Sequence, residues 1–159
     1  WKEFGKDPQW QEAAKKSEEN GKLIARANIY FLKATDFTPK IKPSKGSAMR
    51  TFEMRIYTAM PEKLQNLENR FRDHTMKIFK NNGMQNVAYF TTIEKDPADQ
   101  AKLLYFLAYP DEAAGKLAWQ NFRKDPEWIK ASTASEVNGK LVEKVESVYM
   151  KPMDFSKLK

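Results

Sequence analysis

His74 is the only histidine in the chain, and the sequence holds no cysteine. An imidazole titrates near neutrality, so His74 could act as a general base or as a haem ligand. At about 100° per residue it falls at the edge of an apolar helical stripe, which predicts a semi-buried side chain. The alternative is a packed histidine that is hydrogen-bonded to a carbonyl or a carboxylate. That stripe consists of Leu64, Leu67, Phe71 and Ile78.

A metal site would have to rely on carboxylates alone, because one histidine and no thiolate are available. We therefore expect no metal and no cofactor. The sequence also contains no Gly-rich phosphate loop, no Walker sequence and no dinucleotide fingerprint.

Arg55 shares one face of a predicted strand with Glu53 and Tyr57. If that face lines an interior cavity, the guanidinium suits a carboxylate or another planar anion, with a phenol nearby. If Arg55 and Glu53 pair across the sheet or across a dimer seam, they are structural. Two tyrosines on central strands could line the same cavity or fill it as core. The candidate ligand-binding residues are Glu53, Tyr57, Tyr89 and Tyr105, and the candidate catalytic residues are His74 and Arg55.

Two further groups of residues resemble functional motifs but favour a structural interpretation. Trp119, Phe122 and Trp128 follow helical spacing beside an Asp-Pro pair, which indicates packing under a helix rather than cofactor stacking. Ser135 has no histidine near it in the sequence to activate its hydroxyl. We expect Ser135 and Glu136 to form hydrogen bonds at a helix end.

The elements that position these residues follow one order. The alternation in TFEMRIYT predicts a strand from residue 51, and a helix follows over residues 61–83. Two strands, NVAYFTTI and KLLYFLAY, come next, and Asp111 is expected to cap a second helix. Asp125-Pro126 restarts a helix that ends at Asn138-Gly139, and a strand follows at 142–150. This order predicts an α+β, ferredoxin-like, split βαβ fold whose helices cover only one face of the sheet.

The chain contains an internal repeat. Residues 1–37 match residues 119–155 without a gap at an offset of 118, with sixteen identities in 37 positions. We expect residues 1–37 to be the C-terminal part of a first repeat and residues 51–159 to be a complete second domain. A longer parent would then have carried the front of the first repeat.

The net charge of +7 does not by itself indicate nucleic-acid binding. Residues 38–50 carry four basic and no acidic side chains, whereas 1–37 carry seven and six and 51–159 carry seventeen and fifteen. A nucleic-acid-binding domain concentrates charge on a folded face, so 38–50 is interpreted as a basic flexible linker and no nucleic-acid partner is expected. No apolar run is long enough to predict a membrane span. The compartment stays open, with an exported bacterial protein among the alternatives.

An ordered series of short motifs resembles the NIPSNAP family over residues 51–159, and residues 1–37 resemble the closing third of the same domain. These motifs are FEMRIYT, FRDHTMKIFKNNGM, NVAYF, LLYFLAY, FRKDPEW and SEVNGKLVEKVESVYMKPMDFS. The resemblance implies a dimeric α/β-barrel, in which two ferredoxin-like sheets from two chains or two repeats face each other. It includes a histidine at the position of His74, whereas some members carry another histidine near the position of Tyr105.

Two functions of different class follow from this resemblance. The first is a non-enzymatic binding or scaffolding protein that forms a homodimer, or pairs with the missing part of the first repeat, and has a possible small-ligand cavity in the barrel. The alternative is a cofactor-independent monooxygenase-like or isomerase-like enzyme for a small anionic or aromatic substrate. There Arg55 would anchor the substrate and His74 would move a proton. The first is favoured, because no second catalytic group is identifiable.

Overall fold

The computed structural model describes residues 1–44, 48–93 and 100–159, and the chain divides into two units, Trp1–Tyr30 and Phe31–Lys159. The first unit holds a 3-10 turn, η1 (Phe4–Lys6), and helix α1 (Pro8–Ser17).

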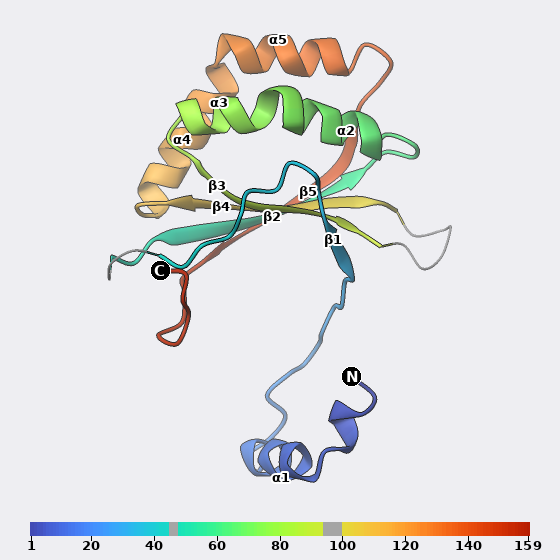
Figure 1. Ribbon diagram of the computed structural model, residues 1–159, viewed down its shortest axis with the longest axis vertical. Helices are drawn as coiled ribbons and strands as arrows, with labels where there is room; N and C mark the ends of the chain where they lie inside the picture. The colour runs from blue at the N-terminus through green and yellow to red at the C-terminus, as the bar shows by residue number, and fades with distance from the viewer. Residues whose placement is uncertain (45–47, 94–99) are drawn as a thin grey trace. The chain divides into compact units, whose positions relative to one another are not determined.

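The second unit is one five-stranded antiparallel sheet with helices on one of its faces, as Figure 1 shows. Its strands are β1 (Leu32–Ala34), β2 (Thr51–Ala59), β3 (Gln85–Thr92), β4 (Lys102–Tyr109) and β5 (Val142–Met150). Its helices are α2 (Leu64–Arg70), the π-helical turn η2 (Phe71–Thr75), α3 (Met76–Asn81), α4 (Glu112–Lys124) and α5 (Pro126–Ser135).

The strand order β1-β3-β4-β2-β5 contains the ferredoxin-like arrangement that the sequence predicts. The α+β, ferredoxin-like prediction is therefore confirmed. Strand β1, from the segment that matches the second copy, extends the sheet at the outer edge of β3, where Lys33 lies opposite Thr91.

The alternation of strand β2 separates two faces as expected. Glu53, Arg55 and Tyr57 point toward the helices, since their neighbours include Trp119 of α4 and Phe71 of η2. Phe52, on the opposite face, lines a shallow recess with residues of β4, β5 and the C-terminal segment. We call this second surface the open face, because the helices of the second unit all lie on the other side (Figure 1). From the strand registers, its apolar residues are Phe52, Met54, Ile56, Ala88, Phe90, Leu104, Phe106, Ala108, Val148 and Met150.

The predicted helix over 61–83 forms as three consecutive segments with a π turn in the middle. The wider turn keeps both Phe71 and Thr75 buried, and it rotates His74 away from the apolar stripe. His74 is exposed, so the prediction of a semi-buried histidine is wrong for this reason. The stripe itself is confirmed, since Leu67 and Ile78 are buried.

The remaining helix ends follow the capping residues. Asp111 accepts a hydrogen bond from the Ala114 amide, and Asp125 accepts one from the Glu127 amide before Pro126. Helix α5 ends at Ser135, earlier than predicted, and a turn closed by Gly139 at φ 99° leads into β5.

Candidate functional site

Glu53 lies in the layer between sheet and helices, with 1% of its surface exposed. Its Oε1 accepts hydrogen bonds from Arg55 Nη1 at 2.7 Å and Ser147 Oγ at 2.6 Å. Its Oε2 accepts from Tyr109 OH at 2.6 Å and Trp119 Nε1 at 2.7 Å. These donors come from β2, β5, β4 and α4, so one carboxylate joins three strands to a helix.

The four donors decide the ionisation of Glu53. Burial raises the pKa of its carboxyl, but the hydrogen bonds from Ser147, Tyr109, Trp119 and Arg55 outweigh burial and hold the pKa below its ordinary value of 4.5. A carboxylate offers about four acceptor positions, and all of them are engaged here. Glu53 is therefore an anchored anion and has no acceptor position left for a substrate proton.

Arg55 is held between the carboxylate of Glu53 and two aromatic rings. Its guanidinium carbon lies 4.0 Å from the centroid of the Trp119 ring and 5.5 Å from that of Tyr57. Burial lowers the pKa of Arg55, but Tyr105, Tyr57 and Glu53 together raise this pKa by more than burial lowers it. The side chain therefore stays a cation. The ion pair joins two residues of the same strand, rather than residues across the sheet or a dimer seam, and it lies beneath the helices rather than on the open face.

The tyrosines pack as core. Tyr89 and Tyr105 are both fully buried, and their rings stack with centroids 5.3 Å apart at an interplanar angle of 13°. The Tyr89 hydroxyl donates a short hydrogen bond to Asn86, and burial raises the pKa of both phenols above the ordinary value. Tyr57 meets Phe71 and Tyr105 edge-on. These side chains fill the layer between the sheet and the helices.

Within the part of the chain that the structure describes, three polar atoms in this layer remain unsatisfied, one of them Thr91 Oγ1 on the same face of β3 as Tyr89. Among the described residues, neither Arg55 Nε nor Tyr105 OH has a hydrogen-bond partner, and both atoms are buried. Such groups are costly unless a water molecule or a ligand satisfies them. Arg55 and Tyr105 lie opposite each other on β2 and β4, so a small polar molecule that reached both atoms would gain hydrogen bonds there.

Close approach of α4 makes the Glu53 cluster possible. A side-chain carbon at Gly115 would lie 3.0 Å from the Tyr109 ring, so glycine lets the helix rest on that ring. Trp119, one turn further along α4, then reaches the carboxylate.

His74 lies elsewhere, in a polar pocket of about 340 Å³ between α2–η2 and α5. Lys63, Asp73 and Asn138 also line this pocket. Over the described ranges, no hydrogen bond or ion pair joins His74 to Arg55 or to the candidate tyrosines. The structure therefore does not bring the two candidate catalytic residues together.

The same pocket contains the helix-end contacts that the sequence predicts. The buried Arg70 donates from Nη1 to Glu136 Oε1 at 3.0 Å and to Ser135 Oγ at 3.3 Å, and it lies over the Trp128 ring. Ser135 donates in turn to the carbonyl of Ser132. The expected helix-end role of Ser135 and Glu136 is confirmed.

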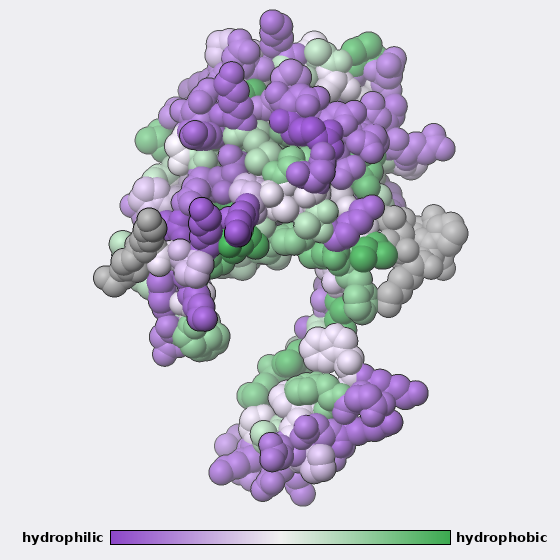
Figure 2. Space-filling view, viewed as in Figure 1, coloured by the Kyte–Doolittle hydropathy of each residue, from purple (hydrophilic) through white to green (hydrophobic). Residues whose placement is uncertain are grey.

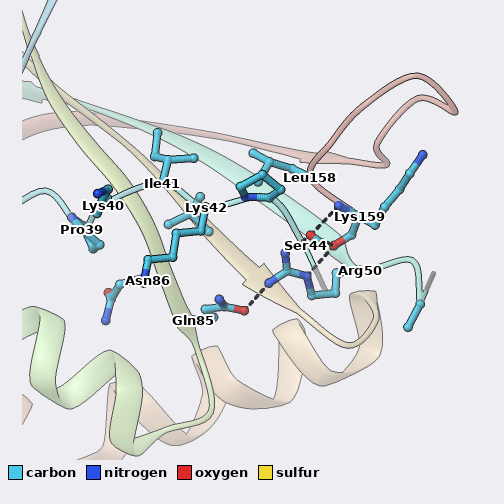
Figure 3. A pocket seen from close by; sticks show the side chains of 13 residues that line it. Pro39, Lys40, Ile41, Lys42, Ser44, Arg50, Gln85, Asn86, Leu158 and Lys159 are labelled. Atoms are coloured by element: carbon cyan, nitrogen blue, oxygen red, sulfur yellow. Dashed lines mark hydrogen bonds between the residues drawn. The ribbon is translucent and has the colours of Figure 1, made fainter. Parts of the chain in front are cut away.

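A larger pocket of about 550 Å³ is lined by residues 39–44, by Ala48 and Arg50, by the start of β3 and by the last residues of the chain (Figure 3). Arg50 lies at its centre and donates from Nε to the Lys159 carbonyl at 2.6 Å, from Nη2 to Ser44 Oγ at 2.9 Å, and from Nη1 to Gln85. Three of the five guanidinium N–H groups of Arg50 thus bond to the chain itself, and two of these bonds, to Lys159 and to Ser44, hold the C-terminal segment in place.

Several absences apply to the described residues. No group of three or more histidine and carboxylate side chains within 1–44, 48–93 and 100–159 could hold a metal ion. Within the same ranges, no helix is long and apolar enough to cross a bilayer.

The surface separates into two kinds. Figure 2 shows mostly hydrophilic residues over the helices of the second unit, and a mixture of hydrophilic and apolar residues on the surface of the first unit. Exposed apolar side chains of the first unit include Leu23, Ile24 and Ile29.

The fold and the Glu53 layer define an α+β domain of the ferredoxin-like class, and comparison with known families makes this assignment specific. The NIPSNAP family model matches residues 52–157, and the chain belongs to the NIPSNAP family. A search among curated proteins gives no match.

Three solved structures illustrate the similarity. A NIPSNAP family protein of unknown function from Agrobacterium tumefaciens strain C58 is 21% identical, with a TM-score of 0.59 over 72% of this chain and 97% of its own. A second NIPSNAP family protein from the same strain is 19% identical, with a TM-score of 0.60 over 76% and 100%. An uncharacterized NIPSNAP-like domain protein from Burkholderia xenovorans is 17% identical, with a TM-score of 0.57 over 69% and 90%. At these identities the similarity supports the fold alone.

Sequence reasoning missed three partners of Glu53, namely Tyr109, Ser147 and the indole N–H of Trp119. Tyr109 lies two and four residues beyond Leu107 and Tyr105 on one strand face, so its orientation was accessible from the alternation. The register that places Ser147 opposite Arg55 could not be predicted from the alternation, because it depends on the pairing of two residues that are 92 positions apart.

Proposed function

We propose that this chain is a non-enzymatic binding and scaffolding protein of the NIPSNAP family. It pairs the open face of its sheet with the same face of a second copy, which closes an α/β-barrel. The observation that carries the proposal is the group of open-face apolar side chains that stay partly or fully exposed in the single chain, namely Met54, Ile56, Phe90, Phe106, Val148 and Met150. Phe52, Ala88, Leu104 and Ala108 on the same face are already buried within the chain, so the six exposed side chains form the apolar surface that a partner would cover.

Rough magnitudes favour pairing. An interface of standard size buries about 1,600 Å² in total, and at about 65% apolar and about 25 cal/mol per Å² this contributes about 25 kcal/mol. Association costs about 4–15 kcal/mol. An apolar sheet face has enough surface to offset that cost.

The layer beneath the helices argues for a structural rather than a catalytic role. Glu53 has every acceptor position engaged, and Arg55 neutralises it. A proton-transfer mechanism would need a group within hydrogen-bond reach of the substrate beside Arg55. His74 does not supply that group, since it lines the pocket against α5.

The test is the oligomeric state of the whole chain, measured by light scattering after size-exclusion chromatography. We expect the wild type to be a dimer and Ile56→Glu to be monomeric, because a buried, unpaired carboxylate costs several kcal/mol at the interface. Leu117→Glu is the matched control, since Leu117 is 57% exposed on α4. It should stay dimeric, and circular dichroism should show all three proteins folded. A folded, monomeric wild type, or a dimeric Ile56→Glu, would contradict the proposal.

A second candidate function rests on the unsatisfied Arg55 Nε and Tyr105 OH. Together these atoms favour a small polar ligand that accepts hydrogen bonds in the layer beneath the helices. Native mass spectrometry of purified protein would then report a bound adduct that Tyr105→Phe loses. If the hydroxyl is merely unpaired, wild type and Tyr105→Phe should show the same absence of an adduct. Tyr105→Phe should then not lower the free energy of unfolding.

A further inference from the structure

We propose that residues 151–156, KPMDFS, are a docking segment for a second ferredoxin-like domain of this family whose β3 edge is uncovered. The segment would add to that edge as residues 33–38, KATDFT, add to β3 in this chain. The acceptor edge is distinct from the open face, whereas Lys151, Pro152 and Ser156 of the docking segment line a recess at the end of that face.

The contacts of residues 33–38 define the acceptor. Strand β1 pairs with β3, the Thr35 amide donates to the Tyr89 carbonyl at 3.1 Å, and the Tyr89 amide donates to Thr38 Oγ1 at 2.8 Å. The segment therefore covers main-chain groups of an edge strand that would otherwise be open to another chain.

Two side chains give the contact its specificity. The carboxylate of Asp36 accepts from Arg72 Nε at 2.9 Å and from Arg72 Nη2 at 2.7 Å, which is a bidentate pair. Phe37 is half-buried with its ring 5.6 Å from that of Tyr89, and the Arg72 guanidinium lies 5.2 Å from the Phe37 centroid. The acceptor therefore recognises an Asp-Phe pair through Arg72 and an aromatic wall.

The same pair in the second copy makes no such contact. Asp154 and Phe155 correspond to Asp36 and Phe37 at the offset of 118, yet Phe155 is 80% exposed and Met153 is 61% exposed. The Asp154 carboxylate accepts a hydrogen bond only from the Phe155 amide among the described residues. Figure 1 shows this segment as a loop that projects from the sheet before the C-terminus.

The loop is anchored on both sides, which holds the pair outward. Strand β5 ends at Met150, and beyond the loop the Lys157 carbonyl accepts from the Ser44 amide at 2.9 Å. The Lys159 amide donates to Ser44 Oγ at 2.7 Å, and Arg50 holds the Lys159 carbonyl. A short loop fixed at both ends presents Asp154 and Phe155 with little loss of conformational freedom on docking.

Pro152 is compatible with docking. It corresponds to Ala34, which lies between two positions of the ladder, since the Thr35 amide bonds to Tyr89 and the Ile93 amide to Phe31. The alternation of an antiparallel pair then directs the Ala34 amide away from β3, so the missing N–H of proline costs no hydrogen bond there.

The second domain must be another molecule or another repeat, because residues 33–38 already occupy this chain's own β3 edge. The test therefore uses the full chain with its edge opened by Asp36→Ala and Phe37→Ala together. The probe is a fluorescein-labelled peptide of residues 150–157, and binding is followed by fluorescence anisotropy. An equivalent peptide of residues 32–39 serves as the reference.

We expect both peptides to bind the opened chain at least tenfold more tightly than the wild type, whose edge is occupied. Binding of the 150–157 peptide should be lost when it carries D154A and F155A, or when Arg72→Ala is added to the chain. If the reference peptide binds and the 150–157 peptide does not, the proposal is overturned. Failure of both peptides, or equal binding to wild type and opened chain, overturns it as well.

Two additions keep the result interpretable. If the double variant does not fold, Asp36→Ala alone is used to weaken the contact of residues 33–38 with β3. Binding of the same two peptides is then compared on the Asp36→Ala chain. Adding Ile56→Glu, which disrupts pairing through the open face, should leave peptide binding unchanged. Loss of dimerisation and loss of docking are thus observed separately.

Discussion

Residues 1–30 and their counterparts 119–148 have closely related sequences but different surroundings. Helices α1 and α5 are both ten residues long, and each starts at an Asp-Pro pair whose aspartate caps the first turn. Gly21 and Gly139 both adopt positive φ, at 114° and 99°. The shared residues therefore produce the same local structure in both copies.

Burial is where the copies differ. Trp119 and Phe122 are 6% and 3% exposed, whereas the corresponding Trp1 and Phe4 are 84% and 47% exposed. The second copy rests on β2 and β4, and the indole of Trp119 reaches Glu53. The comparison teaches that caps are encoded locally, while burial of the aromatic residues requires a sheet beneath them.

The largest expected contrast is between Phe122→Ala and Phe4→Ala. Removing the buried ring should lower the free energy of unfolding by about 3–5 kcal/mol, because it leaves a cavity beside Phe79 and Trp128. Removing the exposed ring should change it by less than about 0.5 kcal/mol. Urea denaturation followed by circular dichroism measures both, and equal losses would refute the contrast.

Glu53→Gln should have the next largest effect. It leaves the buried Arg55 without its counter-ion, which costs about 3 kcal/mol. Because folding lowers the pKa of Glu53, its contribution to stability is present above the ordinary value of 4.5 and is lost as the pH falls through the folded pKa. The melting temperature should therefore decrease less steeply between pH 7 and pH 3 for the variant than for the wild type. Parallel curves would show that Glu53 does not titrate as described.

The smallest effect compares the two helix caps. Asp125→Ala should lower the free energy of unfolding by about 1 kcal/mol, since the side chain caps α5 and also accepts from Asn82 at 2.7 Å. Asp7→Ala should leave the main unfolding transition in place and reduce only the helical signal of residues 8–17. A shift of the main transition by Asp7→Ala would mean that the first unit unfolds together with the second.

Much of the fold could be predicted because local patterns determine it. The strand KLLYFLAY begins and ends where its apolar run does, and VEKVESVYM forms β5 over its whole length. Asp111 and Asp125 begin their helices as expected. The π turn could not be predicted, since no residue in FRDHT requires it, and it displaced His74 from its expected position.

The candidate site was harder to predict, because alternation separates two faces without saying which face the helices cover. The face with charged residues is the buried one, since Glu53 has four donors to satisfy it. Those donors are brought together by strand register and by the approach of α4, which are tertiary properties. The Glu53–Arg55 pairing was considered at the sequence level only across the sheet or a dimer seam, and the structure has it between two residues of one strand.

The central claim is that a second copy covers the open face, and the native methionines can report this directly. Hydrogen peroxide oxidation followed by peptide mass spectrometry compares Met54 on the open face with the exposed Met153 and the buried Met84. Pairing predicts that Met54 is protected nearly as well as Met84 in the wild type and becomes much more reactive in Ile56→Glu. If Met54 is oxidised at the same rate in both folded proteins, the open face is uncovered and the account is wrong.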